Sequence, residues 1–208
     1  MEYNVSDLEK FEKNIDIELP KDWNVGIIYG ASGSGKTTIA EECFGKENIK
    51  DYESFIWQKD KSIMDSFPKN MTTEDIVGLL HQVGFSSIPN YVKPFHVLSN
   101  GEKYRVFVAR CLAESENEIV VIDEFTSIVD RQIAKIMSLS ISKAIKKLNR
   151  KIILLSCHKD ILDWLNPDWE YDADLDSYQK KTTHDQNLNS QSKKYLANTG
   201  IYSKNIII

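Results

Sequence analysis

Residues 30–37, which read GASGSGKT, fit the G-x-x-x-x-G-K-[ST] pattern of a phosphate-binding loop. An apolar run at residues 25–29 comes before the loop, and residues 37–44 can continue from it as a helix. Glycines allow a tight turn whose backbone N–H groups face phosphate oxygens, and the N-terminus of the following helix adds partial positive charge. A chance glycine-serine turn is the alternative, but a strand before the motif and a helix after it favour a nucleotide site.

Two side chains of this loop have a defined chemistry. The Lys36 ammonium would reach the β- and γ-phosphates, and the Thr37 hydroxyl would bind Mg²⁺. The motif leaves the reaction open, since kinases, GTPases, helicases and transport motors all use it. The residues of this stretch that we expect to contact the nucleotide are Gly30, Ala31, Ser32, Gly33, Ser34, Gly35, Lys36, Thr37 and Thr38.

Composition limits the class of protein. The 208 residues suit one medium domain with appendages, and 41% hydrophobic with 27% charged residues is typical of a soluble globular protein. A net charge of −5 argues against a wholly basic nucleic-acid binder. No apolar run approaches the roughly 18–20 residues that span a bilayer, and the polar, acidic N-terminus is unlike a signal peptide. Cys43, Cys111 and Cys157 fit neither a disulfide framework nor a zinc site, so we expect a cytoplasmic protein.

Apolar periodicity predicts the order of the elements. Alternating or continuous apolar runs predict strands at residues 14–19, 25–29, 54–57, 118–124 and 151–156. Helical spacing predicts helices at residues 71–84, capped by Thr72 or Thr73, and at 101–114 and 131–149. Strands that alternate with helices predict an α/β fold, with a P-loop NTPase core and a mostly parallel sheet.

Four further segments, in order, resemble the motifs of the ABC-type ATPases. Residues 98–110 (LSNGEKYRVFVAR) resemble the signature motif and its helix, and residues 119–130 (IVVIDEFTSIVD) resemble the Walker B strand, catalytic glutamate and D-loop. His158, directly after a predicted strand, resembles the switch histidine, and Gln58 the Q-loop glutamine. The resemblance covers roughly residues 10–165 and identifies the chain as a small, stand-alone ABC-type ATPase, outside the transporter branch.

The resemblance implies a domain organisation. Residues 1–175 would form the ATPase domain, with a short, mostly helical ABC subdomain inserted at about residues 59–113. Residues 176–208 are polar and lack periodicity, so we expect a disordered or irregular tail. Its last eight residues are apolar enough to dock on a surface that the sequence does not identify.

Two adjacent carboxylates have the positions that the chemistry needs. Asp123 ends an apolar strand, so its carboxylate would emerge beside the phosphate loop and hold Mg²⁺. Glu124 would face the γ-phosphate, where a carboxylate can orient or deprotonate the attacking water. Taken alone, Asp-Glu after a strand is equally compatible with a solvated turn. The predicted metal ligands are Thr37, Asp123 and Gln58, and the predicted catalytic residues are Lys36, Glu124 and His158.

The signature segment implies a partner subunit. Ser99 and Gly101 begin a helix, and a helix N-terminus preceded by Ser is an anion site. The resemblance implies an ATP-dependent, head-to-tail homodimer in which each signature helix caps the nucleotide on the other subunit. Hydrolysis would then loosen the dimer. Asp130 would run along the dimer interface.

Other residues have weaker grounds. His158 would stabilise charge at the γ-phosphate, and Gln58 would contact Mg²⁺ or water, although an exposed loop glutamine is the alternative. Phe11 is the candidate for stacking on adenine, with Tyr3 and Trp23 as alternatives, and a core position is the more common fate of an aromatic residue.

Some residues depart from the family pattern. Asn100 replaces the first signature glycine, Glu102 stands where transporters usually have Gln, and Phe125 stands where Pro is usual. The basic run at residues 143–151 could touch nucleic acid, but a solvated helix face is the more common role of such a run.

The expected function is Mg²⁺-dependent binding and hydrolysis of ATP that switches a protein or nucleic-acid partner through homodimerisation. One alternative is the nucleotide-binding subunit of a transporter with separate membrane chains, and another is a nucleic-acid-processing ATPase. A non-hydrolysing binding module is disfavoured because Glu124 and His158 are both present.

Overall fold

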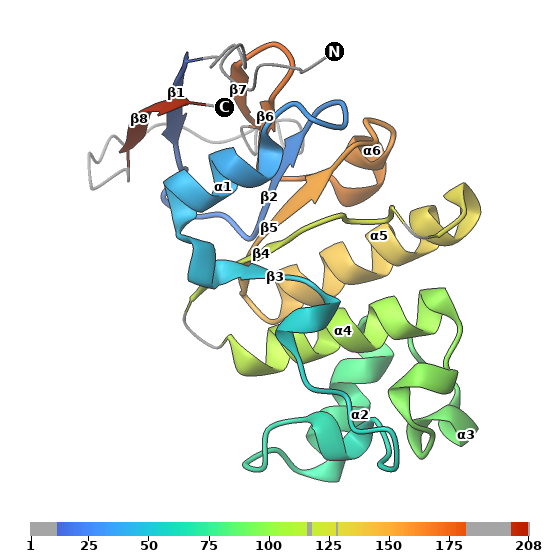
Figure 1. The fold of residues 1–208 in the computed structure, drawn as a ribbon. Coiled ribbons are helices and arrows are strands. Elements are labelled where there is room, and N and C mark those ends of the chain that lie inside the picture. Colours follow the sequence, from blue (N-terminus) through green and yellow to red (C-terminus); the bar gives the residue numbers. More distant parts are fainter. Residues whose placement is uncertain (1–11, 116–117, 128, 182–200, 208) are drawn as a thin grey trace, which may run out of the picture.

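The computed structural model describes residues 12–115, 118–127, 129–181 and 201–207. Its main sheet has six strands in the order β3-β4-β5-β2-β6-β7 (Figure 1). All neighbouring pairs are parallel except β6 and β7, so the predicted α/β fold with a mostly parallel sheet is confirmed. The strands are β2 (Val25–Tyr29), β3 (Ile49–Lys50), β4 (Ile119–Ile122), β5 (Lys151–Ser156), β6 (Trp169–Asp172) and β7 (Ser177–Lys180).

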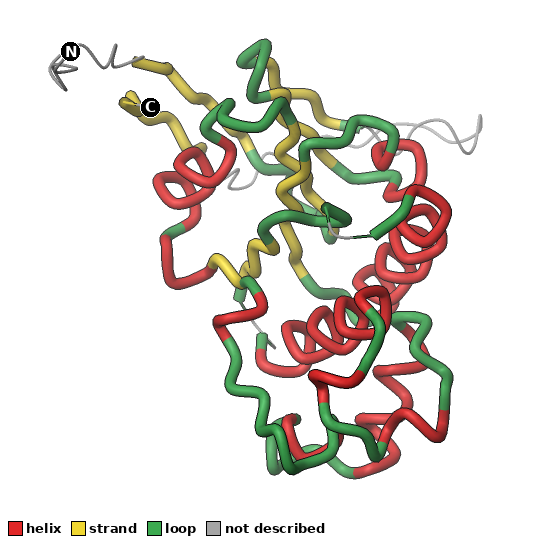
Figure 2. The backbone as a smooth tube through the Cα atoms, turned by 45° about the vertical axis from the view of Figure 1, so that its right-hand side comes forward, coloured by secondary structure: helices red, strands yellow, loops and turns green. Residues whose placement is uncertain are grey.

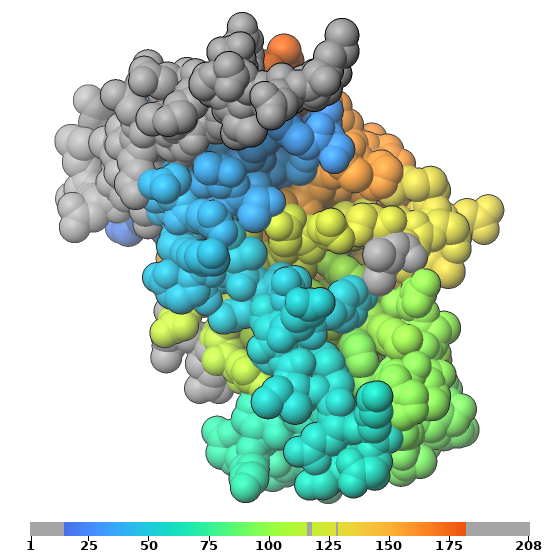
Figure 3. All heavy atoms as spheres, in the orientation of Figure 1, coloured from blue at the N-terminus to red at the C-terminus, as the bar shows by residue number. Residues whose placement is uncertain are grey.

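Three α-helices follow strands of the sheet: α1 (Lys36–Phe44) after β2, α5 (Arg131–Lys147) after β4 and α6 (Ile161–Leu165) after β5. The 3₁₀ helix η2 (Lys46–Asn48) leads into β3. Between β3 and β4 the chain is helical, with η3 (Tyr52–Ser54), η4 (Met64–Ser66), α2 (Thr73–Gln82), α3 (Ile88–Tyr91), η5 (Phe95–Val97) and α4 (Asn100–Glu114). Figure 2 shows these helices gathered at one end of the molecule, and in Figure 3 they form its lower part, in cyan and green.

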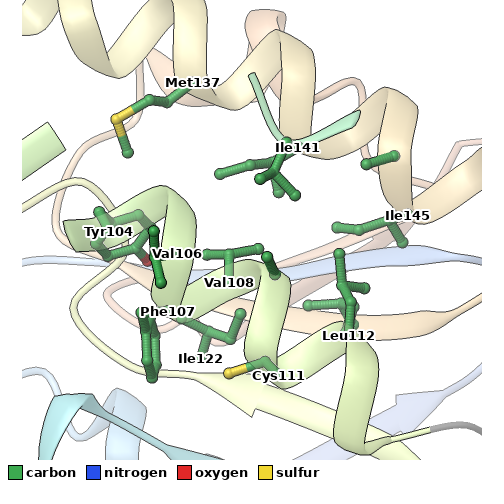
Figure 4. Close-up of a cluster of buried hydrophobic side chains, with 14 of the residues drawn as sticks. Tyr104, Val106, Phe107, Val108, Cys111, Leu112, Ile122, Met137, Ile141 and Ile145 are labelled. Carbon is green, nitrogen blue, oxygen red and sulfur yellow. The ribbon is translucent and has the colours of Figure 1, made fainter. Parts of the chain in front are cut away.

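The two faces of the sheet pack against different helices. Because strand side chains alternate, Ile152 and Leu154 of β5 join a core with α4 and α5, whereas Ile153 and Leu155 join one with α1. Burial on both faces explains why β4 and β5 read as continuous apolar runs. In the close-up of Figure 4, buried side chains from three elements meet, namely Tyr104, Phe107, Val108 and Leu112 of α4, Ile122 of β4, and Met137, Ile141 and Ile145 of α5.

Gly26 lets β6 approach β2. A Cβ at Gly26 would lie 2.2 Å from ring atoms of Trp169, which is fully buried, so a side chain at this position would overlap the indole. Trp23 packs against the same indole in an edge-to-face contact, with 5.6 Å between ring centroids. The aromatic core at this end of β2 therefore depends on a glycine.

A second, two-stranded sheet joins the ends of the described chain. β1 (Glu12–Glu18) pairs antiparallel with β8 (Ile201–Ile207), with Glu12 opposite Ile207. The prediction of a strand at residues 14–19 is confirmed, and its Ile15 and Ile17 are buried. In Figure 1 these strands lie at the opposite end of the molecule from α2 and α3.

The strand predicted at residues 54–57 is wrong. Asp51 caps η3 through reciprocal hydrogen bonds with Ser54, and the chain continues as a loop. Phe55 is buried, and Trp57 stacks on Phe95 with 3.8 Å between ring centroids. Phe55 and Trp57 therefore pack on the helical region. In this part of the chain only the two-residue strand β3, which precedes the predicted strand, belongs to the sheet.

The predicted tail, residues 176–208, contains two strands. β7 extends the main sheet, and the hydroxyl of Tyr178 donates a hydrogen bond to the carbonyl of Glu18. Residues 201–207 of the predicted docking segment, residues 201–208, pair antiparallel with β1 as strand β8, and Ile208 lies outside the described residues. Residues 182–200 lie outside the described residues.

Other elements agree with expectation. The helix predicted at residues 71–84 is α2, and Thr72 is its N-cap in a capping box with Asp75. Within the part of the chain that the structure describes, no helix has both the length and the apolar character to cross a membrane.

Candidate active site

The phosphate loop connects β2 to α1. Gly33 and Gly35 have φ angles of 82° and 85°, in the left-handed region that favours glycine. The Lys36 ammonium donates hydrogen bonds to the carbonyls of Gly30, at 3.0 Å, and Ala31, at 2.6 Å. The Lys36 side chain therefore folds back onto the first two residues of the phosphate loop, Gly30 and Ala31.

Asp123 and Thr37 lie side by side. The Thr37 hydroxyl donates a 2.9 Å hydrogen bond to the Asp123 carboxylate, since β4 ends at the same edge of the parallel sheet as β2. The backbone N–H of Glu124 donates to the other Asp123 oxygen at 2.7 Å, and Glu124 has a φ of 51°. A left-handed turn thus follows Asp123 immediately.

A cavity of about 530 Å³ opens beside this pair. Three of the predicted site residues line it, namely Thr37, Asp123 and Glu124. The sequence analysis predicts no site role for the other residues that line it, which are Glu41, Lys46, Ile49, Asp51, Tyr52, Glu53, Tyr104, Phe107 and Ser127. Of these residues, Tyr104 and Phe107 lie within the signature segment and Ser127 within the Walker B segment, and no motif marks the others.

The Thr37–Asp123 pair fits Mg²⁺. A hydroxyl and a carboxylate are oxygen ligands of the kind that Mg²⁺ prefers, with phosphate oxygens and water in the remaining positions. Among the described residues, no group of three or more His, Cys, Asp or Glu side chains could hold a metal ion.

The signature segment forms a capping box at the start of α4. The Glu102 carboxylate accepts hydrogen bonds from the N–H of Ser99, at 3.0 Å, and from its hydroxyl, at 2.8 Å. Asn90 donates to the other Glu102 oxygen at 2.5 Å. Burial acts to raise the pKa of Glu102, but these hydrogen bonds outweigh it and the pKa is lowered. Among the described residues, neither Ser99 nor Gly101 lines the cavity at Glu124.

Three other predicted residues have defined positions. His158 is half-buried just after β5, and its backbone N–H donates to the Ser156 hydroxyl at 3.1 Å. Asp130 is the N-cap of α5, since its carboxylate accepts from the N–H groups of Gln132 and Ile133, both at 3.0 Å. Gln58 is exposed in a loop and does not line the cavity, so the structure does not bring it to Thr37 and Asp123.

The adenine contact has no described candidate. Phe11 and Tyr3 lie outside the described residues. Trp23, the third aromatic, is only 5% exposed because it packs against Trp169 in the core, so it cannot stack on a base. This alternative is wrong.

Three features together define the class of protein. They are a phosphate loop between β2 and α1, a carboxylate pair after β4, and a helical segment inserted between β3 and β4 that ends in the signature helix α4. This is the fold of the ABC-type ATPases, and the predicted resemblance to them is confirmed.

Solved structures with this fold are similar to the chain. cbiO1 from Clostridium perfringens, part of the ABC transporter complex cbiONQ, has a TM-score of 0.57 and 21% identity over 72% of each chain. A dimeric structure of MJ0796, a bacterial ABC transporter cassette, has a TM-score of 0.55 and 14% identity over 77% of this chain and 84% of that one. Its post-hydrolysis state with ADP and Pi covers the same shares, with a TM-score of 0.56 and 15% identity. At these identities the likeness is one of fold.

Sequence relatives agree. The oligopeptide transport ATP-binding protein OppD of Lactococcus lactis subsp. cremoris (strain SK11) is 29% identical over 196 residues, and OppD of subsp. lactis (strain IL1403) has the same identity. The match covers 71% of this chain, and the chain spans only 57% of the length of these relatives. No protein-family model matches the chain.

Proposed function

We propose that this chain binds ATP with Mg²⁺ and hydrolyses it. The observation that carries the proposal is the 2.9 Å hydrogen bond between the Thr37 hydroxyl and the Asp123 carboxylate, beside Glu124 and one residue from Lys36. Thr37 and Asp123 would hold Mg²⁺, which neutralises phosphate charge when it is bound. Gln58 remains a proposed metal contact that would require its loop to move toward this pair.

The remaining roles follow from chemistry. Within residues 30–38, the backbone N–H groups that follow Ala31 would hold the phosphates, because the Gly30 N–H donates to the Ser156 carbonyl and the Ala31 N–H to the Asp174 carboxylate. Lys36 would contact the β- and γ-oxygens. Glu124 would accept a proton from the attacking water, and His158 would stabilise charge at the γ-phosphate. Phe11 remains the proposed adenine contact.

We infer that two copies join head to tail around two nucleotides. Ser99 and Gly101 of one copy would complete the other copy's site, which is supported by the resemblance of residues 98–110 to the signature motif. The dimeric structures of MJ0796 also support this arrangement. Ser99 would exchange its hydrogen bond to Glu102 for one to phosphate, and Asp130 would lie along the interface.

Hydrolysis in such a dimer would act as a switch. The switched partner would be a protein complex or a nucleic acid in the cytoplasm. Residues 1–175 would be the ATPase domain, with residues 59–113 as its helical subdomain.

The names of the relatives favour a second candidate function. OppD is named as an oligopeptide transport protein, and cbiO1 and MJ0796 as transporter components. The chain could then be the nucleotide-binding subunit of a transporter with separate membrane chains. Co-purification with membranes, lost on mild carbonate washing, would favour this candidate over a switch that acts on soluble partners.

Equilibrium binding of ATP tests the proposal. Wild-type protein should bind ATP with Mg²⁺, and Lys36→Ala should weaken binding by about 100-fold or more, because a charge-assisted contact to the phosphates is lost. The exposed Lys61 provides the matched control, since Lys61→Ala removes the same charge outside the site. Equal affinity for wild type and Lys36→Ala would contradict the proposed site.

A further inference from the structure

An acidic turn outside the predicted motifs contacts the phosphate loop. Asp174 lies in the turn between β6 and β7, and its carboxylate accepts hydrogen bonds from the backbone N–H of Ala31, at 2.9 and 3.1 Å to the two oxygens. A Cβ at Gly30 would lie 3.1 Å from the same carboxylate, so the turn and the loop are closely packed. Asp174 thus touches the loop at its first peptide group.

That peptide group also holds Lys36. The Ala31 N–H and the Gly30 carbonyl belong to one planar unit, and the carbonyl accepts the hydrogen bond from the Lys36 ammonium at 3.0 Å. Fixing the N–H end therefore fixes the direction of the carbonyl. An anion at the N–H end also polarises the peptide, which makes its carbonyl a stronger acceptor for the ammonium.

Asp172 fixes the turn that presents Asp174. Asp172 is 5% exposed, and its Oδ1 accepts from the N–H groups of Asp174, at 2.9 Å, and Leu175, at 3.2 Å. Its Oδ2 accepts from the ammonium of Lys159 at 3.0 Å, and Lys159 directly follows His158. Burial acts to raise the pKa of Asp172, but these partners outweigh it and the pKa is lowered. The buried carboxylate is therefore an ionised anchor.

We propose that Asp174 is a positioning residue for Lys36. It orients the Gly30–Ala31 peptide, which holds the lysine ammonium at the start of the phosphate loop, and Asp172 holds Asp174 in place. The inference rests on the proposed nucleotide site. A carboxylate at this edge also repels phosphate, so the positioning effect must exceed the repulsion for Asp174 to favour binding.

Equilibrium binding of a fluorescent ADP analogue and of ATP, each with Mg²⁺, tests the inference on the full chain. Asp174→Ala should weaken binding about tenfold, and Asp174→Asn, which keeps an acceptor oxygen without the charge, should weaken it by less. Asp22, exposed in the turn before β2, lies at the opposite end of that strand, so Asp22→Asn is the charge-matched control and should bind like wild type.

Two comparisons separate the possible failures. If wild type itself binds no nucleotide, the proposed function fails, whereas normal or tighter binding by both Asp174 variants overturns only this inference. The action through Lys36 is tested by adding Asp174→Ala to Lys36→Ala and titrating at millimolar nucleotide. If Asp174 acts through Lys36, adding Asp174→Ala to Lys36→Ala should not weaken nucleotide binding further. A full additional tenfold loss of affinity in the double variant would contradict the proposed route. Melting temperatures without nucleotide check that each variant folds. If Asp174→Ala does not fold, the binding comparison is made with Asp174→Asn alone.

Discussion

The hydroxyl of Thr37 and the carboxylate of Asp123 meet at 2.9 Å across 86 residues of sequence. Thr37 lies in the first turn of α1, and Asp123 directly follows β4. Two strand ends of one parallel sheet therefore converge on the place where we propose that Mg²⁺ and the phosphates bind.

Asp123→Asn should reduce ATP turnover by at least about tenfold and should raise the Mg²⁺ concentration needed for half-maximal rate. The amide keeps the size of the side chain but removes the charge that would hold the cation. Chelation of Mg²⁺ should abolish turnover in wild type. Asp60→Asn, at an exposed loop position, is the control. An unchanged Mg²⁺ dependence in the Asp123 variant would argue against this metal site.

Glu124→Gln should trap an ATP-bound dimer. Without the carboxylate that accepts the proton of water, the closed state would persist for as long as ATP stays intact. Sedimentation velocity with saturating ATP and Mg²⁺ should show a dimer for this variant and a monomer when Ser99→Ala is added. A monomer for Glu124→Gln at saturating ATP would contradict the proposed head-to-tail dimer.

Glu102 should make the free energy of unfolding decrease as the pH falls into the acid range. Its pKa is lowered in the folded chain, so the unfolded chain binds the proton more tightly. The stabilisation is complete above the ordinary glutamate range and is lost as the pH falls through the folded pKa. Glu102→Gln should cost about 0.5–2 kcal/mol near neutral pH and flatten this dependence, measured by urea unfolding. Glu74→Gln, at an exposed position in the first turn of α2, should leave the pH dependence as in wild type.

Loss of the hydroxyl should lower the free energy of unfolding at Tyr91 but not at Tyr104. Tyr104 is 2% exposed, and its hydroxyl has no hydrogen-bond partner in the described part of the chain. The Tyr91 hydroxyl donates to the Phe85 carbonyl at 3.2 Å. In urea unfolding, Tyr104→Phe should leave the free energy of unfolding equal or higher, whereas Tyr91→Phe should lower it by about 0.5–1.5 kcal/mol. A loss at Tyr104 as large as that at Tyr91 would reveal a partner for its hydroxyl.

Local patterns in the sequence predicted much of the site. The glycines of the phosphate loop indicate left-handed backbone, and Thr72 predicts the start of α2. The apolar run before Asp123 predicts a strand that ends at the site. These features depend on neighbours within a few residues. Periodicity and capping rules therefore apply to them directly.

The approach of Asp123 to the phosphate loop was predicted because parallel strands end at one edge of the sheet, but other features that depend on distant contacts were not predicted. Asp174 reaches Ala31 across 143 residues, and no local pattern around Asp174 signals that contact. The short apolar run at residues 55–57 resembles a strand, but the aromatic rings of Phe55 and Trp57 pack on Phe107 and Phe95 of the helical region. Residues 201–207 form a strand because β1 offers an edge nearly the whole chain away. Propensity is a weak guide where tertiary contacts decide the conformation.

Phosphate release from ATP by wild type and by Glu124→Gln tests the central claim most directly. We predict slow release by wild type that requires Mg²⁺, and a rate about 10²–10⁴-fold lower for the variant, which should still bind ATP with wild-type affinity. Equal rates for the two proteins, or no release by a wild type that is saturated with ATP and Mg²⁺, would contradict the claim that this site hydrolyses ATP.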